Sequence, residues 1–367
     1  MDSGTPFTAQ RPKRMPLAAR RCYRLAVSTA LALALCYGFD LGIPYLSPIF
    51  VVLLAAGAPN PPGLKVALIL LGFVAVALGL GVLLIPLLQM APLSALLAIA
   101  LGIFYCNRLA ILHRKGITAT LLAIGLTVIP AAGILSSALA GAIVEAMVFG
   151  IAVAIVSLWL VYPFFPEDPA LPEDPSLSDD SEPKQATAAT DATPDTWLAL
   201  RATLIVMPAF LLTLTNPANY LPFLVKSILL AREASDTSLR GANRELIGAT
   251  ALGGACAIGV WWCLSLAVEL WFFTGWVLLV SLLLASGAYG IVRNTMSPSF
   301  WINSLTTMLI LLGAAVQDSA SGKDVYQALF VRMVLFLGVT VYALFAMTLL
   351  ERWRKSTRAK KQALPSD

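Results

Sequence analysis

The feature that most constrains this chain is a series of apolar stretches, most of them long enough to cross a lipid bilayer, separated by short polar segments. A helix crosses a bilayer with about 20 apolar residues, and inside lipid its backbone groups are all paired within the helix. Apolar residues make up 59% of the 367 residues and charged residues only 12%, about half the charged fraction of a soluble domain. The sequence therefore predicts an all-α integral membrane protein.

Twelve such stretches fall into two sets of six. The first set lies at 23–39, 43–57, 65–88, 92–110, 117–132 and 136–163. The second set lies at 197–215, 219–231, 245–265, 268–287, 298–316 and 325–350. The stretches 43–57 and 219–231 are short and hold the same place in their half. Short segments at matching places in two halves point to a transport site, although a tilted or partly buried ordinary helix would give the same pattern.

The two halves also repeat one another in residue type. An arginine opens each half, at Arg24 and Arg201, and the short stretch begins near a Tyr-Leu pair, at Tyr45 and at Tyr220. Further correspondences join Gly72 with Gly248 and Gly102 with Gly287. We therefore expect two repeated bundles of about six transmembrane helices each, an architecture in which two halves can rock around a shared site.

Basic residues crowd the two ends of the chain and alternate loops, which sets the expected orientation. Cytoplasmic loops carry the excess of Lys and Arg in membrane proteins, so both termini are expected in the cytoplasm of a bacterial cell, with a multi-pass chain in the inner membrane. Five parts are expected: a basic amino terminus (1–22), a first transmembrane bundle (23–164), an acidic disordered cytoplasmic linker (165–195), a second transmembrane bundle (196–350) and a basic tail (351–367).

Several classes of function are excluded by what the sequence lacks. There is no Cys-x-x-Cys, and the only histidine is His113, so a zinc or iron site is not expected. No Walker motif, nucleophile elbow or His-Glu-x-x-His occurs. The net charge of +5 comes from residues in loops and tails, which is typical of topology rather than of nucleic-acid binding. We expect no enzyme activity, no metal and no cofactor.

The pairs Asn107-Arg108 and Arg293-Asn294 are candidate substrate-binding residues. Each pair ends an apolar stretch at a matching place in its half. A guanidinium binds a carboxylate with two parallel hydrogen bonds, so two of them near a pseudo-twofold axis would suit an organic anion. The alternative is that both arginines are topology anchors whose side chains extend to the lipid headgroups.

Three further candidate substrate-binding residues belong to the two short stretches. Tyr45 and Tyr220 lie at the start of these stretches, and Lys226 lies within the second one. A cation inside an apolar stretch is costly unless it faces water or a partner. Lys226 has no partner within its own stretch, which favours a water-lined position over a lipid-facing one.

Glu145, Arg332 and Asp40 are candidates for coupling or gating. Glu145 lies deep in the sixth stretch and Arg332 at nearly the same place in the twelfth. Such charges indicate a function when they face a cavity, and a proton-linked carboxylate opposite an arginine is one interpretation. A structural ion pair or a position near a helix end is the other. Asp40 precedes the first short stretch and lines an outer vestibule or forms a turn.

Some of these residues resemble a known superfamily. Arg24 before an Ala/Leu-rich stretch, the Pro44-Tyr45-Leu46-Ser47-Pro48 break and the run Arg244-Glu245-Leu246-Ile247-Gly248-Ala249-Thr250 are similar to the fusaric acid resistance-like and aromatic acid exporter superfamily. The resemblance implies an inner-membrane efflux component for aromatic carboxylic acids, working beside a periplasmic adaptor protein of the membrane-fusion type. The chain departs from larger members in having only a linker and a short tail where they carry cytoplasmic domains.

Together these observations predict an exporter of small organic acids, driven by the proton gradient. A passive organic-anion channel of the same fold and a scaffold subunit without transport activity remain as alternatives. The expected partners are a small organic anion, the lipid bilayer and an adaptor protein, with a homo-oligomer left open. No nucleic-acid partner is expected.

Overall fold

The structure is a computed structural model of the whole chain, and it describes residues 15–57, 60–113, 116–167, 195–236, 239–322 and 324–362. Within these ranges every regular element is an α-helix. Of the predicted acidic linker, residues 168–194 lie outside the described part, as do residues 1–14 of the amino terminus and 363–367 of the tail.

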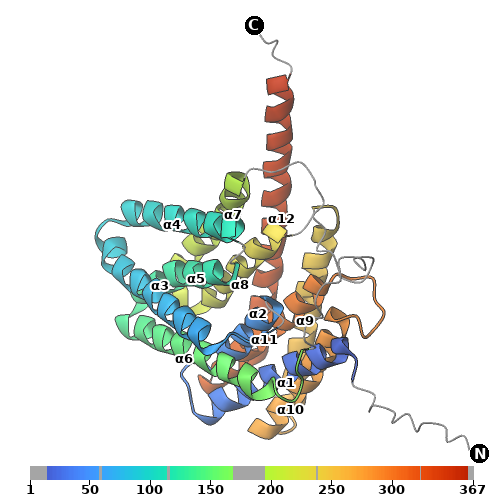
Figure 1. Cartoon of the computed structure of the whole chain (residues 1–367). Coiled ribbons are helices and arrows are strands. Elements are labelled where there is room, and N and C mark those ends of the chain that lie inside the picture. Colours follow the sequence, from blue (N-terminus) through green and yellow to red (C-terminus); the bar gives the residue numbers. More distant parts are fainter. Residues whose placement is uncertain are drawn as a thin grey trace, which may run out of the picture.

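Twelve helices follow one another along the described chain (Figure 1). The first six are α1 (Leu17–Gly38), α2 (Leu46–Gly57), α3 (Leu64–Met90), α4 (Pro92–His113), α5 (Gly116–Leu135) and α6 (Ser137–Val161). The second six are α7 (Asp195–Thr215), α8 (Pro217–Asp236), α9 (Leu239–Leu264), α10 (Leu270–Ala288), α11 (Pro298–Ala320) and α12 (Val325–Gln362). Each contains most of one apolar stretch, so the prediction of twelve helices is confirmed. The helix α12 continues beyond its apolar part and projects from the bundle in Figure 1.

Several connections between helices are very short. A single residue separates α3 from α4 (Ala91), α5 from α6 (Ser136) and α7 from α8 (Asn216). The Ser136 hydroxyl accepts a hydrogen bond from the Leu139 backbone N–H at 3.0 Å, which caps the first turn of α6. Connections this short make the two helices of each pair run in opposite directions.

Small residues set the closest helix packing. Gly81 of α3 lies against the backbone of Gly125 in α5, and a Cβ added at Gly125 would lie 2.8 Å from the Ala77 carbonyl oxygen. In the second half, a Cβ added at Gly253 of α9 would lie 2.5 Å from the Ser304 carbonyl oxygen of α11. Small residues allow membrane helices to approach this closely, so α5 and α11 each pack tightly on the glycine-rich helix of their own half.

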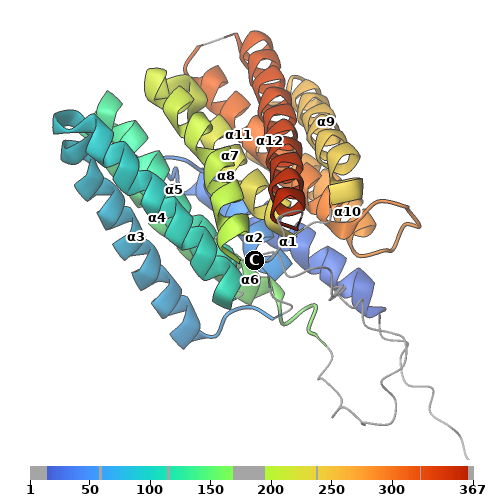
Figure 2. The ribbon, with the colours of Figure 1, turned by 90° about the horizontal axis from the view of Figure 1, so that it is seen from above.

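Four helix pairs make the main contacts between the first six helices and the last six, and α5 also touches α7. The helix α1 packs along α10, α4 along α7, α5 along α8, and α2 against α11. Figure 2 shows the result from above: α3 lies at one side and α9 and α10 at the other, with α8 and α11 between them. Buried apolar side chains from both halves form one continuous core, so the described helices make a single bundle.

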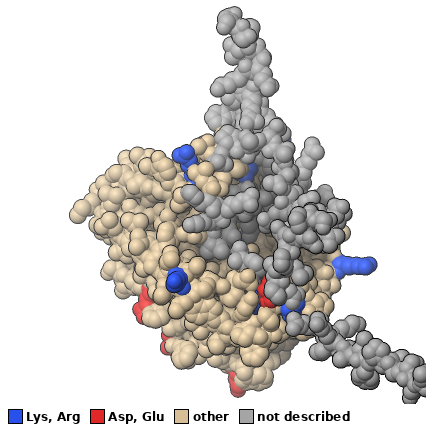
Figure 3. All heavy atoms as spheres, in the orientation of Figure 1, with Lys and Arg blue, Asp and Glu red and all other residues tan. Residues whose placement is uncertain are grey.

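The helices have the length and composition of membrane spans. Nine of them in the described residues are long and apolar enough to cross a bilayer, and the shorter apolar segments Leu46–Ala56 and Tyr220–Ala231 belong to α2 and α8. Large apolar side chains are exposed along α3 and α4, including Ile69 at 72% and Leu93 at 82%. The face drawn in Figure 3 carries few charged side chains among its described residues. The chain is therefore a multi-pass membrane protein whose outer helices face lipid.

Candidate functional site

The helix α11 holds several of the polar residues that are buried in the bundle interior. Most of its side chains are buried, and among them are Asn303, Thr307 and Asp318. It contacts α2, α8, α9, α10 and α12. Polar side chains inside a membrane bundle are costly and face partners or cavities rather than lipid, so the surroundings of α11 are where a functional site is best sought.

Lys226 of α8 is fully buried beside α11. Its Nζ donates hydrogen bonds to Asn303 Oδ1 at 2.5 Å and to Thr307 Oγ1 at 2.7 Å. Thr307 in turn donates to the Asn303 backbone carbonyl at 2.7 Å, so its hydroxyl is oriented to accept from the lysine. The exposure of Lys226 is 0%, which means that the protein interior, and not lipid, surrounds this side chain.

The side-chain amide nitrogen of Asn303 is a spare donor at this place. The nitrogen Nδ2 is buried and has no hydrogen-bond partner in the described part of the chain. The amide is oriented by Lys226, because the oxygen must face the ammonium group and the nitrogen must therefore point away from it. A buried unsatisfied donor is unusual in native proteins, so this cluster offers a hydrogen bond to a further acceptor.

Asp318 and Arg332 form an ion pair between α11 and α12. The Arg332 guanidinium donates to both carboxylate oxygens of Asp318, with Nη2 to Oδ1 at 3.2 Å and a shorter bond from Nη1 to Oδ2. The side chains are 12% and 6% exposed. This two-point geometry is the one that a guanidinium uses to bind any carboxylate.

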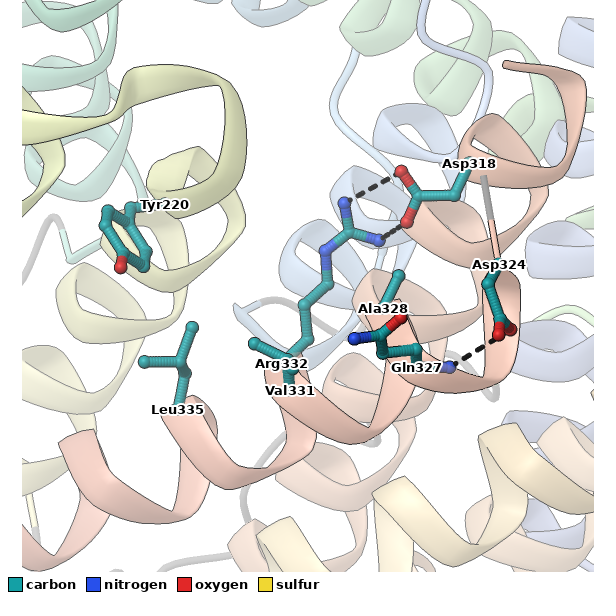
Figure 4. A pocket seen from close by; sticks show the side chains of 8 residues that line it. All are labelled: Tyr220, Asp318, Asp324, Gln327, Ala328, Val331, Arg332 and Leu335. Carbon is teal, nitrogen blue, oxygen red and sulfur yellow. Dashed lines mark hydrogen bonds and ion pairs between the residues drawn. The ribbon is translucent and has the colours of Figure 1, made fainter. Parts of the chain in front are cut away.

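A cavity of about 400 Å³ adjoins this ion pair. Figure 4 shows Arg332 directed toward Asp318, with Tyr220 of α8 across the cavity from the pair. On α12, Leu335 lies on the same side of Arg332 as Tyr220, and Gln327 lies on the other side, near Asp324. Its lining residues are Tyr220, Asp318, Asp324, Gln327, Ala328, Val331, Arg332 and Leu335. We call this the Arg332 cavity. Its volume lies in the range of small-molecule sites.

The first half of the chain also reaches this region. Tyr45, which precedes α2, packs its ring on Gly313 of α11, where no larger residue would leave room. Burial raises the pKa of the Tyr45 hydroxyl, and the nearby charges of Arg332 and Asp318 act on it in opposite directions, Arg332 lowering it and Asp318 raising it. The structure thus brings Tyr45, Tyr220 and Arg332 into one region, three residues that the sequence analysis had named for separate reasons.

Arg108 and Arg293 are not brought together in the same way. Arg108 is exposed near the end of α4, which packs on α3, α5 and α7. Arg293 is exposed in the loop after α10, which packs on α1, α9 and α11. Asn107 is partly buried, and Asn294 donates to the Gly287 and Val292 carbonyls at 3.1 and 2.9 Å.

Glu145 and Asp40 lie on the surface of the bundle. Glu145 is exposed on α6, while the carboxylate that Arg332 contacts belongs to Asp318. Asp40 is exposed in the turn after α1 with a φ of 50°, a left-handed conformation that Asp tolerates better than most residues. The observed geometry at Asp40 is therefore that of a turn residue.

The sequence analysis missed Asp318, Asn303 and Thr307. A signal for Asp318 was present, since it comes two residues after the predicted stretch 298–316 and its helix continues to Ala320. A signal for the other two was also present, because Asn303 and Thr307 are four residues apart and so share one helix face. What was missing was the knowledge that this face meets Lys226.

No metal site is found in the described part of the chain, where no three side chains of His, Cys, Asp or Glu gather. The five cysteines are all free, and three of them are buried. A free cysteine inside an apolar stretch acts as a small apolar residue.

Comparisons with known proteins reach only the first half. Residues 21–161, from α1 to the end of α6, match a family described as "Protein of unknown function (DUF2955)". No curated protein and no solved structure matches the chain. The description of the family names no activity, so the resemblance to aromatic acid exporters stays a prediction.

Proposed function

We propose that this chain is a secondary exporter of small organic acids, above all aromatic carboxylic acids, in the bacterial inner membrane. The single observation that carries the proposal is the Arg332 cavity of about 400 Å³, where a guanidinium whose side chain is 12% exposed lies with one aromatic ring and apolar side chains. The rest of the lining is polar: Asp318, which pairs with Arg332, Asp324 and Gln327. A carboxylate with an apolar body needs the guanidinium, the ring and the apolar side chains, because the charge requires a paired donor and the body requires a dry surface.

The helix contacts support a two-bundle repeat, which such a transporter requires. Each contact within α1–α6 has a counterpart six helices later: α3 with α5 corresponds to α9 with α11, α1 with α2 to α7 with α8, and α2 with α6 to α8 with α12. The main contacts between halves correspond as well, α1 with α10 to α4 with α7 and α5 with α8 to α2 with α11. Two similar units in contact can alternate access to one site by rocking.

The expected orientation gives the cavity its role. With both chain ends in the cytoplasm, as the basic tails favour, the turn between α11 and α12 and the start of α8 lie on the periplasmic side. The Arg332 cavity is then the place from which a substrate leaves, and an adaptor protein would receive it there. The proton gradient is the proposed driving force, because the sequence has no ATP-binding motif.

Transport by everted membrane vesicles tests this proposal. Vesicles containing the full chain should accumulate radiolabelled benzoate when a proton gradient is imposed, and Arg332→Lys should reduce the rate about tenfold, because a lysine keeps the charge and the pairing with Asp318 but loses the two-point fork. Arg352→Lys, an exposed residue of the same helix, is the matched control and should transport like the wild type.

Two outcomes count against the proposal. Accumulation that is equal in Arg332→Lys and in the wild type would remove the cavity from the path. Benzoate movement that follows its own gradient and ignores the proton gradient would identify a channel in place of an exporter.

A further inference from the structure

A second cavity lies at the opposite end of α1 from the Tyr45 turn. It has a volume of about 260 Å³ and lies between α1, α2, α3, α5 and α6. Its polar lining side chains are Arg24, Asn60 and Thr118, and its apolar lining includes Leu54, Leu70 and Leu158. We call it the Arg24 cavity. Fourteen residues of helix separate Arg24 from the end of α1 at Gly38, about 20 Å along the axis.

Trp159 of α6 and Tyr162, the residue after α6, form hydrogen bonds to the wall of this cavity. The Trp159 Nε1 donates to the Pro62 carbonyl at 2.8 Å, and the Tyr162 hydroxyl bonds the Asn60 side chain at 3.1 Å. Both bonds attach the segment before α3 to α6. The cavity is thus a built feature of the fold, because its polar rim is fixed by side chains from a helix about 100 residues away.

Arg24 is already occupied by an acidic side chain. Its Nη1 lies 3.0 Å from Glu167 Oε2, and its guanidinium lies 5.6 Å from the centre of the Tyr162 ring. The side chains of Arg24 and Glu167 are 8% and 11% exposed. Glu167 also accepts a hydrogen bond from Arg21 Nε at 2.6 Å, so it keeps a partner when Arg24 turns to another carboxylate.

We infer that the Arg24 cavity is a second binding site for a small carboxylic acid, in which the carboxylate of the ligand replaces Glu167 on Arg24. The apolar lining takes the body of the acid, and Asn60 and Thr118 supply neutral hydrogen bonds. The class of acid rests on the proposed function, whereas the site and its competition with Glu167 rest on the contacts alone. In the expected orientation this end faces the cytoplasm, so the site receives the acid before it reaches the Arg332 cavity.

Because the ligand competes with Glu167 for Arg24, the two charges have opposite effects on its affinity. Removing the charge of Arg24 weakens binding, and removing the charge of Glu167 strengthens it. Arg24→Gln should weaken binding about tenfold through loss of the paired donor. Glu167→Gln should strengthen it, since the uncharged amide no longer competes. Lys65→Gln is the matched control: Lys65 is an exposed basic residue at the start of α3, next to Val66 of the cavity wall, and does not itself line the cavity.

The experiment is calorimetric titration of the purified full chain in lipid nanodiscs with benzoate. The Arg332→Lys variant serves as the background, so that the site at the other end is weakened in every sample. We expect Glu167→Gln to bind more tightly than this background, Arg24→Gln more weakly, and Lys65→Gln about equally. A gain in affinity cannot come from misfolding, and so Glu167→Gln keeps the test valid even if Arg24→Gln is unstable.

Titrations with three other ligands show which part of the acid the site recognises. Acetate carries the charge alone, benzyl alcohol the apolar body alone, and laurate the carboxylate of a membrane-derived acid. Tighter binding of benzoate than of acetate or benzyl alcohol supports the site, and a preference for laurate assigns it to a lipid-derived acid. Equal affinities of Glu167→Gln, Arg24→Gln and the background would overturn the inference. Failure of vesicle transport with these affinities intact would overturn only the proposed exporter.

Discussion

The helices α5 and α11 are each the fifth of six in their half of the chain, and they differ in chemistry. Both are mostly buried, and both pack closely on a glycine of a neighbouring helix, Gly81 for α5 and Gly253 for α11. The interior of α5 is mostly apolar, with Ile124, Val128 and Ile129 in the core, and its buried polar side chains are those of Thr120 and Thr127. Its buried Thr127 donates only to its own helix, to the Ala123 carbonyl at 2.7 Å.

The corresponding interior of α11 carries Asn303, Thr307 and Asp318, each bonded to a residue of another helix. This difference shows that helix packing and buried polar chemistry depend on different residues. Glycines and apolar faces determine how the helices pack, and they are shared by both halves. Polar groups inside a membrane are costly, and α11 can carry these three because α8 and α12 supply partners for them.

The largest expected effect comes from breaking the ion pair between Asp318 of α11 and Arg332 of α12, whereas α5 has no charged residue to form such a pair. Asp318→Ala should lower the free energy of unfolding by about 3 kcal/mol, because it leaves Arg332 buried without its carboxylate. Thermal unfolding in detergent measures this loss. The double variant Asp318→Leu with Arg332→Met should recover most of it, because an apolar pair resembles the interior of α5. A single variant that melts like the wild type would show that the pair contributes nothing to folding.

A smaller loss is expected when the Lys226 cluster is made partly apolar. Asn303→Leu should cost about 2 kcal/mol, because it removes one acceptor of a buried ammonium group. Thr306→Val is the control on the same helix, since Thr306 bonds only the Ile302 carbonyl of its own helix. The triple variant Lys226→Leu, Asn303→Leu and Thr307→Val should melt near the wild type. A melt as low as that of Asn303→Leu alone would mean that the cluster stabilises the fold.

The feature that α5 and α11 share, close packing against a glycine of a neighbouring helix, is tested by substituting these glycines. Gly81→Ala and Gly253→Ala should each cost about 1–2 kcal/mol, because overpacking against backbone exceeds the gain in helix propensity. Gly79→Ala and Gly259→Ala have open space around them and should melt at or above the wild type. A cost in one half but not in the other would break the correspondence between the two packing interfaces.

The smallest effect is expected at the aromatic side of the Arg332 cavity. Tyr220→Leu should weaken benzoate binding about threefold, because ring contacts contribute on the order of 1 kcal/mol. Tyr220→Phe keeps the ring and should bind benzoate like the wild type in the same titration. If Tyr220→Phe loses as much as Tyr220→Leu, the hydroxyl and not the ring recognises the ligand.

Much of the fold could be predicted from the sequence alone. Twelve apolar stretches determined twelve helices, since a chain in lipid has to satisfy its backbone groups within each segment. Tyr45, Tyr220 and Arg332 could be named because a polar or aromatic residue stands out against an apolar background. Gly81 and Gly253, where helices pack closely, are also visible in the sequence as small residues within apolar stretches.

Only the tertiary structure decided which of these residues meet. Asp318 meets Arg332, and Asn303 and Thr307 meet Lys226, because α8, α11 and α12 pack together in one order out of many that the same apolar surfaces would allow. Helices in lipid have no hydrophobic preference among neighbours, so the pairing depends on small residues and hydrogen bonds distributed over the whole bundle. For that reason the sequence determined the helices of this protein, and their packing determined its cavities.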